Sequence, residues 1–335
     1  MTGGGTVRRR TVIGFATALL AAPGGLLAQP SQRIYRVGAF TFGANPVLRD
    51  HMRVFRERLQ QLGFAEGRSL QIVEEYSSSD PVVRTQSADK LIRAKPDVIL
   101  SFGSTNTRSI QAASANKLPV VFTMVGDPVA YGIVKELARP GGNTTGVGFL
   151  QREMAVKRLE LLREVLPKVR RVIVAAYQQD ITYVASEPLF RQIAARLGFE
   201  LVMAELFGPT PDAAVGKAME GGADAVFVYQ PMSFVVGLEA PEKIVHLAMG
   251  RRIPVFFAEP DLVARGGLLS YGPDFLDETR RAADLVAKVL RGANAGTLPV
   301  EQSTRFELVV NLKTARALGI EIPATVRPRI DRLIQ

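Results

Sequence analysis

The stretch MVGDPVAYGIVKELARPGGNTTGVGF, residues 124–149, lies near the middle of the chain and joins two similar halves. It follows a short apolar strand predicted at Leu118–Phe122. Tight turns rich in glycine, proline and Asn or Asp are expected at 126–128 and 140–143. Between the turns the pattern predicts a short helix over Ile133–Ala138, and after them a second strand over Thr145–Phe149. The stretch therefore ends one α/β unit and leads into the next.

Strands and helices alternate regularly before this stretch. Each predicted strand is a short apolar run, and helices begin at signals such as Asn45-Pro46 and Asp80-Pro81. The alternation predicts a parallel sheet covered by helices, and it restarts after Phe149. The strands are expected at Ile34–Phe40, Leu70–Tyr76, Val98–Ser101 and Val120–Phe122, and then at Arg171–Ala176, Glu200–Glu205, Ala225–Tyr229 and Pro254–Phe257.

The two halves also share sequence at a constant shift of 135 residues. Leu-Gly-Phe at position 62 recurs at 197, and the strand LPVVF at 118 recurs as IPVFF at 253. The segment YGIV at 131 is matched by GGLL at 266. Three matches at one shift predict two lobes of the same plan. Because open parallel sheets bind ligands at the carboxyl ends of their strands, a cleft between the lobes is the expected binding place.

We expect an α/β fold in which the chain crosses between the lobes three times, near residues 146–150, 270–274 and 299–304. Lobe I would comprise residues 33–147 plus about 274–300, and lobe II residues 149–271 plus about 305–335. Three crossings give a hinge with a defined closing motion. Its expected members are Gly146, Gly148, Tyr271 and Gly272.

Composition narrows the class of protein. A chain of 335 residues with 47% hydrophobic residues can build two lobes. The net charge is +10, but the basic residues are interspersed with acidic ones, so we expect no nucleic-acid partner. The absence of cysteine excludes disulfides, thiol catalysis and Cys-based zinc sites. The two histidines, His51 and His246, are expected to be packing or surface residues, so we expect neither a metal site nor a cofactor.

The first 28 residues resemble a secretory signal. Arg8, Arg9 and Arg10 precede an apolar run, Thr11–Ala22, and Ala28 supplies a small residue for cleavage. No cysteine follows that could carry a lipid, which predicts a periplasmic protein without a lipid anchor. The arginine pair leaves both the general and the twin-arginine export routes open. No later apolar run is long enough to span a membrane.

The strongest binding signal in the first half is the polar turn Gly103-Ser104-Thr105-Asn106 at a predicted strand–helix junction. Its hydroxyl, amide and helix N-terminal N–H groups suit a ligand carboxylate or another anion, and N-capping of the helix by Ser104 is the alternative. Asp127 follows a strand and either pairs with a ligand ammonium or binds its own turn. Phe40 and Thr41, at the end of the first strand, complete this wall, with core packing as the alternative for Phe40.

The opposite wall should come from residues that end or follow strands of the second half. Tyrosine offers a flat apolar face with a polar tip, which suits contact with an organic ligand. The expected ligand-contacting residues here are Tyr177, Gln178, Tyr229, Gln230 and Glu259. We find no nucleophile, base and orienting group in a catalytic arrangement, so we expect no enzyme.

The chain resembles the ABC-transporter substrate-binding proteins related to the TrpX-type tryptophan/tyrosine-binding proteins. The resemblance covers nearly all of the chain after the leader and rests on several motifs. They are GDPV at 126, GIV at 132, RPGGNTTGV at 139, KRLELL at 157, GGLLSYG at 266, LPVEQ at 298 and FELVVNLKTA at 306. The resemblance implies a type I periplasmic-binding-protein fold of two Rossmann-like lobes, with delivery of ligand to an inner-membrane permease.

Two functions remain open at this point. The first is a monomeric solute-binding protein that closes around a small polar organic ligand, such as an amino acid or a carboxylate, and passes it to an ABC permease. The alternative is a soluble ligand-sensing module that signals to a membrane receptor. A gene for a permease and an ATPase, or for a receptor, beside this one would separate the two.

Overall fold

The computed structural model describes residues 1–5, 33–43, 46–78, 80–178, 181–206, 210–230 and 239–335. Residues 1–33 and 34–335 form two separate units. Of the first unit, residues 1–5 are exposed and without regular structure. The predicted signal peptide, residues 1–28, therefore lies almost entirely outside the described residues, as does the predicted helix cap Asn45. Every element named below belongs to the second unit.

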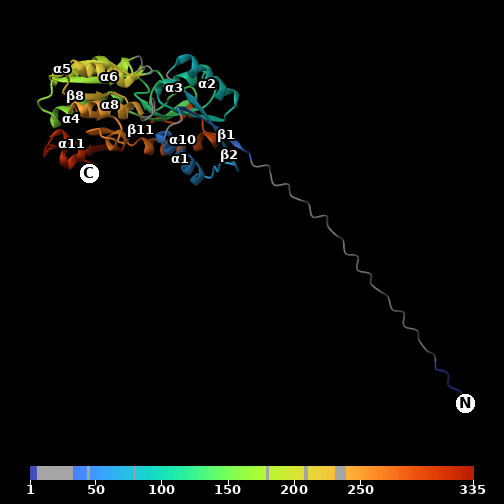
Figure 1. The fold of residues 1–335 in the computed structure, drawn as a ribbon. Coiled ribbons are helices and arrows are strands. Elements are labelled where there is room, and N and C mark those ends of the chain that lie inside the picture. The colour runs from blue at the N-terminus through green and yellow to red at the C-terminus, as the bar shows by residue number, and fades with distance from the viewer. Residues whose placement is uncertain (6–32, 44–45, 79, 179–180, 207–209, 231–238) are drawn as a thin grey trace. The chain divides into compact units, whose positions relative to one another are not determined.

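The first sheet has six strands in the order β11-β5-β4-β3-β1-β2, all parallel. Strands β1, β2 and β11 of this sheet are labelled in Figure 1. The predicted βα alternation of the first half is confirmed, because each strand is followed by a helix up to β4. The bounds are β1 Tyr35–Phe42, α1 Pro46–Gln61, β2 Leu70–Ser77, α2 Pro81–Arg93, β3 Val98–Phe102, α3 Ser104–Ala113, β4 Val120–Gly126, β5 Thr144–Phe149 and β11 Glu301–Gln302.

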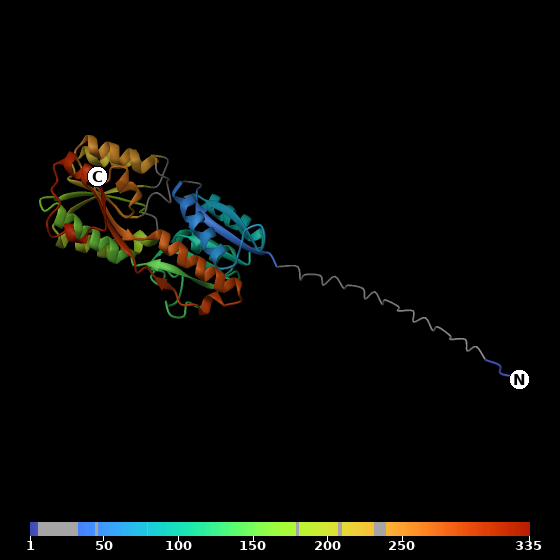
Figure 2. The same ribbon diagram turned by 90° about the horizontal axis from the view of Figure 1, so that it is seen from below.

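Helices cover both faces of the first sheet. Successive residues of β1 point to opposite faces, so Val37 and Ala39 pack with α1 and α10, whereas Phe40 packs with α2 and α3. Helix α10, Phe275–Leu290, comes from late in the chain but contacts α1, β4 and β5 (Figure 2). Its N-cap residue Asp274 accepts a hydrogen bond from the Asp277 amide at 2.9 Å. The first sheet is therefore completed by a helix from the C-terminal part.

The second sheet has seven strands in the order β13-β12-β10-β9-β8-β6-β7. Strands β10-β9-β8-β6-β7 repeat the order β5-β4-β3-β1-β2 of the first sheet, which confirms the internal repeat. The strands of this sheet are parallel as predicted, except that β10 and β12 pair antiparallel. The bounds are β6 Arg171–Ala176, β7 Glu200–Glu205, β8 Ala225–Val228, β9 Val255–Phe257, β10 Leu269–Pro273, β12 Phe306–Asn311 and β13 Arg332–Ile334.

Two apolar clusters lie on the two faces of the second sheet, one containing Val172 and Phe227 and the other Ile173 and Val226. The first includes buried residues of α4 and α5, and the second those of α6 and α8. The helices with this sheet are α4 Gln151–Val165, α5 Ile181–Arg196, α6 Pro211–Glu220, α8 Glu239–Gly250, α9 Asp261–Ala264 and α11 Leu312–Leu318.

Three connections join the two sheets: from β5 into α4, from β10 into α10, and from β11 into β12. They fall where the sequence predicted crossings, although the two-residue strand β11 was not expected. Short 3₁₀ turns at Ala295–Thr297 and Arg327–Arg329 complete the described elements. The proposed lobe boundaries, 33–147 with 274–300 and 149–271 with 305–335, remain a prediction.

The helix predicted over Ile133–Ala138 is wrong. This segment is a series of bends, in which the Ile133 amide donates to the Pro128 carbonyl and the Lys135 amide to the Pro140 carbonyl. Gly132, with a φ of 64°, interrupts any helical run at its start. The apolar residues of the segment instead pack against Phe122 and Val125 of β4 in the first sheet. Tertiary packing has therefore overridden a weak helical pattern.

Two glycines of the predicted hinge, Gly146 and Gly272, lie against backbone. A Cβ atom on Gly146 would lie 2.3 Å from the Phe122 carbonyl oxygen, and one on Gly272 would lie 2.2 Å from the Ala258 carbonyl oxygen. Neither has a positive φ. Glycine is therefore required at both crossings because neighbouring strands approach closely, and their role in a hinge motion remains a prediction.

Candidate functional site

Buried polar atoms without partners gather at the carboxyl ends of the first sheet's strands. Asn106 is fully buried, and neither its amide nitrogen nor its amide oxygen forms a hydrogen bond. The hydroxyls of Thr41 and Thr123 are also fully buried and unbonded. In the sheet register Thr123 pairs with Phe102, the last residue of β3, just before α3 begins. Because an unsatisfied buried polar group costs about 1–3 kcal/mol, these atoms mark a place built for a further polar partner.

The turn at residues 103–106 begins α3 in a way the sequence did not show. Gly103, not Ser104, is the N-cap, and no side chain caps this helix, so the N-capping alternative for Ser104 is wrong. Gly103 has a φ of 81°, which favours glycine because a Cβ atom is strained there. Thr105 is half-buried, and its carbonyl accepts from the Ser109 hydroxyl. No capping side chain therefore covers this helix end, whose dipole favours an anion.

Phe40 and Thr41 differ in their surroundings. Phe40 is fully buried in the cluster with Leu91, Ile99 and Ile110. This position corresponds to the alternative of core packing. Thr41 points to the opposite face and has an unbonded hydroxyl. Of this pair, Thr41 is the one with a group to offer a ligand.

The second-sheet residues are largely engaged with one another. The Gln230 side chain spans two strand ends, since its amide oxygen accepts from the Tyr177 amide at 3.1 Å and its amide nitrogen donates to the Tyr177 carbonyl at 3.2 Å. The Gln178 amide donates to the Glu205 carboxylate at 3.3 Å. Glu259 is buried to 1% exposure. These residues lie at the carboxyl ends of their strands, as predicted. The Gln230 side chain, however, uses its amide group to bind the Tyr177 backbone.

Tyr229 is surrounded by aromatic residues and by Arg158, which the sequence did not predict. Its ring makes edge contacts with Tyr183 and Phe190 at centroid distances of 5.2 Å. Its carbonyl accepts hydrogen bonds from Arg158, at 2.8 Å, and from Gln151, at 3.2 Å. Burial raises the pKa of Tyr229 above its usual value, so its hydroxyl stays protonated at neutral pH.

Asp127 lies at the junction of the two sheets. Its carboxylate pairs with the Arg152 guanidinium at 3.3 Å and accepts from the Arg152 amide at 3.4 Å and the Tyr131 hydroxyl at 3.3 Å. Tyr131 in turn faces the Ser186 hydroxyl at 3.4 Å. Burial and the neighbouring Glu153 raise the pKa of Asp127 despite these contacts. These contacts join Asp127 both to α4, through Arg152, and to its own turn, through Tyr131.

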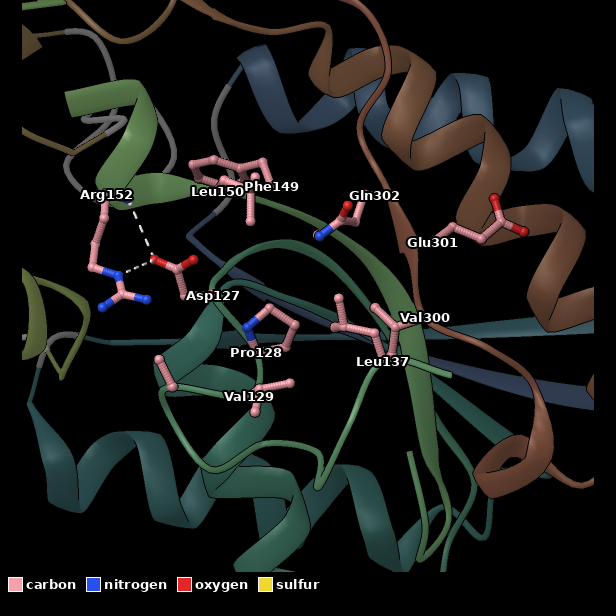
Figure 3. A pocket seen from close by; sticks show the side chains of 12 residues that line it. Asp127, Pro128, Val129, Leu137, Phe149, Leu150, Arg152, Val300, Glu301 and Gln302 are labelled. Atoms are coloured by element: carbon pink, nitrogen blue, oxygen red, sulfur yellow. Dashed lines mark hydrogen bonds and ion pairs between the residues drawn. The ribbon is translucent and has the colours of Figure 1, made fainter. Parts of the chain in front are cut away.

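A pocket of about 250 Å³ opens beside Asp127 (Figure 3). It is walled by the loop after β4, by the crossing from β5 into α4, and by β11 of the third crossing. Predicted ligand residue Asp127 and predicted hinge residue Gly148 both line it. The full lining is Asp127, Pro128, Val129, Ala130, Leu137, Gly148, Phe149, Leu150, Arg152, Val300, Glu301 and Gln302.

A buried carboxyl ties the crossings together. Glu278 of α10 is 1% exposed and accepts a hydrogen bond from the Met124 amide at 3.0 Å, while its other oxygen bonds the Ser303 hydroxyl. The Ser303 amide donates to the Gly148 carbonyl at 2.9 Å. Burial raises the pKa of Glu278 to about 8. Glu278 and Ser303 therefore connect β4, the first crossing and the third crossing.

The matched family model decides the class of the protein. Residues 37–332 match the model described as "ABC transporter substrate binding protein". The chain belongs to this family. As a substrate-binding protein it has the two-sheet α/β arrangement described above, and the resemblance found in the sequence is confirmed. Within the described residues no helix is long and apolar enough to cross a membrane, and no group of three or more His, Asp or Glu side chains could hold a metal ion.

Three similar proteins each match most of this chain, one in sequence and two in structure. A protein named "Tyrosine-binding protein" from Clostridioides difficile (strain R20291) is 25% identical over 294 residues, covering 87% of this chain and 83% of its own. A conserved domain protein from Vibrio cholerae is 28% identical with a TM-score of 0.81, covering 90% of this chain and 100% of its own. An ABC domain in complex with L-Trp from Streptococcus pneumonia is 22% identical with a TM-score of 0.80, at the same coverage.

Proposed function

We propose that this substrate-binding protein is the periplasmic component of an ABC importer that takes up an amino acid or a similar small carboxylate. The ligand would lie between the two sheets and pass to a permease in the inner membrane. The observation that carries the proposal is the group of buried, unbonded polar atoms on Thr41, Asn106 and Thr123, in a chain of this family. The names of the tyrosine-binding relative and of the L-Trp complex favour an aromatic amino acid.

The residues suit the two ends of an amino acid. The N-terminus of α3, with Gly103 to Asn106 and no capping side chain, would receive the carboxylate, since the helix dipole favours an anion there. Tyr177, which is half-buried, offers aromatic surface for the side chain from the second sheet, whereas Tyr229 is fully buried against Tyr183 and Phe190. Asp127 is engaged with Arg152, so pairing with the ligand ammonium would require exchange of that partner. A ligand that contacts both sheets stabilises the closed arrangement by its differential contacts.

The alternative is a sensing module that hands its ligand state to a membrane receptor. It uses the same cleft and the same closure, so ligand binding alone does not separate it from import. Genes for a permease and an ATPase beside this gene support import, and a receptor gene in their place supports sensing.

Replacing Asn106 with leucine is expected to weaken ligand binding at least about tenfold while leaving the unliganded protein equally or more stable. An apolar side chain of similar shape removes two unsatisfied polar atoms, which is neutral or favourable without ligand. The ligand would lose one or two buried hydrogen bonds, each worth about 1–3 kcal/mol when its partner is left unpaired. A thermal-shift screen with L-tyrosine, L-tryptophan and small carboxylates, followed by calorimetry, measures both effects.

Thr107→Val is the matched control one residue away. The Thr107 hydroxyl is already bonded to the Gly103 carbonyl at 2.8 Å and to the Ser101 hydroxyl at 3.1 Å. This variant should lose stability and keep its affinity, the reverse of Asn106→Leu. If Asn106→Leu binds the ligand as tightly as the wild type, the assignment of this wall fails. If none of these compounds raises the melting temperature, the ligand class is wrong.

A further inference from the structure

The pocket beside the crossings is distinct from the cleft wall described above. Of the predicted ligand residues only Asp127 lines it, and the Asp127 carboxylate is held by Arg152 and Tyr131. The pocket lies over β5 and β11, at the edge of the first sheet, whereas Thr41 and Asn106 belong to β1 and α3. A molecule in this pocket would therefore not occupy the place of a ligand held by α3.

The walls of the pocket are mainly apolar. Pro128, Leu137 and Val300 lie on one side of it, and Phe149 and Leu150 lie on the other (Figure 3). Val129 is 43% exposed and Leu150 is 36% exposed, although both are large hydrophobic residues. Exposed apolar surface that lines a concave site is a mark of a binding place. The volume of about 250 Å³ exceeds the roughly 150 Å³ apolar cavity that holds one benzene ring.

The charged groups at the rim are already neutralised. Asp127 pairs with Arg152, and the Glu301 carboxylate pairs with Arg281 at 2.7 Å. The Glu301 side chain is directed away from the other lining residues, whereas the Gln302 amide is directed toward the centre (Figure 3). Each acidic lining residue therefore already has a basic partner, so the pocket offers a charged occupant no uncompensated charge of opposite sign. The complementary molecule is neutral, with an apolar body and one hydrogen-bonding group.

We propose that this pocket is a second small-molecule site, which takes a neutral, flat molecule of one or two fused rings whose hydrogen-bonding group meets the Gln302 amide. Its walls come from the loop after β4, from the first crossing and from the third crossing. An occupant therefore contacts two of the three connections between the sheets at once and stabilises the arrangement in which these two converge. This gives the protein a site through which a second molecule biases the state of the hinge.

Indole is a suitable probe, because it is neutral and bicyclic and carries one N–H donor. The chain contains no tryptophan, so indole emission can be followed without a tryptophan background. The wild-type protein should bind indole saturably with a dissociation constant on the order of 1 mM, accompanied by a blue shift of the emission. Val129→Asp should weaken this binding at least tenfold, since it places an unpaired charge in the apolar wall.

The matched controls separate the pocket from the cleft. Val82→Asp makes the same change on α2, where Val82 is 65% exposed, and should leave indole binding unchanged. Asn106→Leu should also leave it unchanged, even where amino-acid binding is lost. Absence of saturable indole binding to the wild type overturns the proposal. So does binding that survives Val129→Asp but is lost in Asn106→Leu, because indole would then lie in the cleft.

Discussion

Replacing Arg158 with methionine is expected to lower the free energy of unfolding by about 2–4 kcal/mol. The Arg158 side chain is 1% exposed, and its guanidinium donates to the Val228 carbonyl at 2.9 Å and to the Tyr229 carbonyl at 2.8 Å. It also lies 5.1 Å from the centre of the Phe227 ring. Methionine keeps the apolar stem but leaves the carboxyl end of β8 without these donors, and Gln151 can satisfy only the Tyr229 carbonyl.

Burial lowers the pKa of Arg158 to about 10, so the side chain remains charged at neutral pH. A buried charge is tolerated only where its donors form hydrogen bonds, and here they bind the last residue of β8, Val228, and the next residue, Tyr229. The loss should therefore also loosen the second-sheet wall of the cleft. Urea unfolding of both proteins at pH 7 measures the change, with equal m-values as the sign that the transition is unaltered.

Arg163→Met is the matched control on the same helix. Arg163 also donates to backbone carbonyls, those of Pro167 at 2.9 Å and Val169 at 2.7 Å, but it is only half-buried. Water can replace its hydrogen bonds, so this variant should lose less than half as much stability. If both variants lose the same amount, burial of the guanidinium is not what makes Arg158 important.

Local pattern and internal repetition were enough to predict most of the fold. Apolar runs such as Val98–Ser101 fall on observed strands, and the 135-residue shift correctly implied two sheets of one plan. The errors lie where long-range contacts decide the structure. Ile133–Ala138 forms bends because its apolar residues pack under the first sheet, and β12 runs antiparallel because the chain returns to the second sheet from the first.

The site was predicted less completely than the fold. Residues at strand ends, such as Asn106 and Tyr229, could be chosen because parallel sheets place ligands there. Thr123 was missed because it stands inside an apolar run that indicates only a buried strand. Its one available signal was a hydroxyl residue near the end of that run. Arg158 and Glu278 were missed because they resemble ordinary charged positions of amphipathic helices, and only packing between distant segments buries them.

Two buried groups are expected to give the stability of the protein opposite dependences on pH. Burial raises the pKa of Glu278 to about 8 from 4.5, so the folded protein binds more protons than the unfolded chain between these values. Stability from this group is fully present below pH 4.5 and is lost as the pH rises through 8. Burial lowers the pKa of His51 to about 4 from 6.5, so its contribution increases with pH over that range.

The two slopes, each at most about 1.4 kcal/mol per pH unit, oppose one another between pH 4.5 and 6.5. The combined contribution of Glu278 and His51 to the free energy of unfolding should therefore change little over this range and should decrease between pH 6.5 and 8. Glu278→Gln keeps an acceptor for the Met124 amide and a donor for the Ser303 hydroxyl, but it cannot ionise. The free energy of unfolding of Glu278→Gln, relative to that of the wild type, should therefore increase steadily as the pH rises from 4.5 to 8.

His51→Gln provides the opposite comparison, since a glutamine amide can still meet the Thr279 hydroxyl that lies 2.7 Å from the His51 ring nitrogen. The difference in free energy of unfolding between His51→Gln and the wild type should vary with pH only below pH 6.5. Urea unfolding of the three proteins from pH 4.5 to 8.5 gives both differences, and the titration of all other groups cancels in them. A Glu278→Gln difference that does not vary with pH would mean that Glu278 is already ionised in the folded protein. In that case the carboxyl that joins β4 to the third crossing would be a permanent charge, and alkaline pH would not loosen the connections between the sheets.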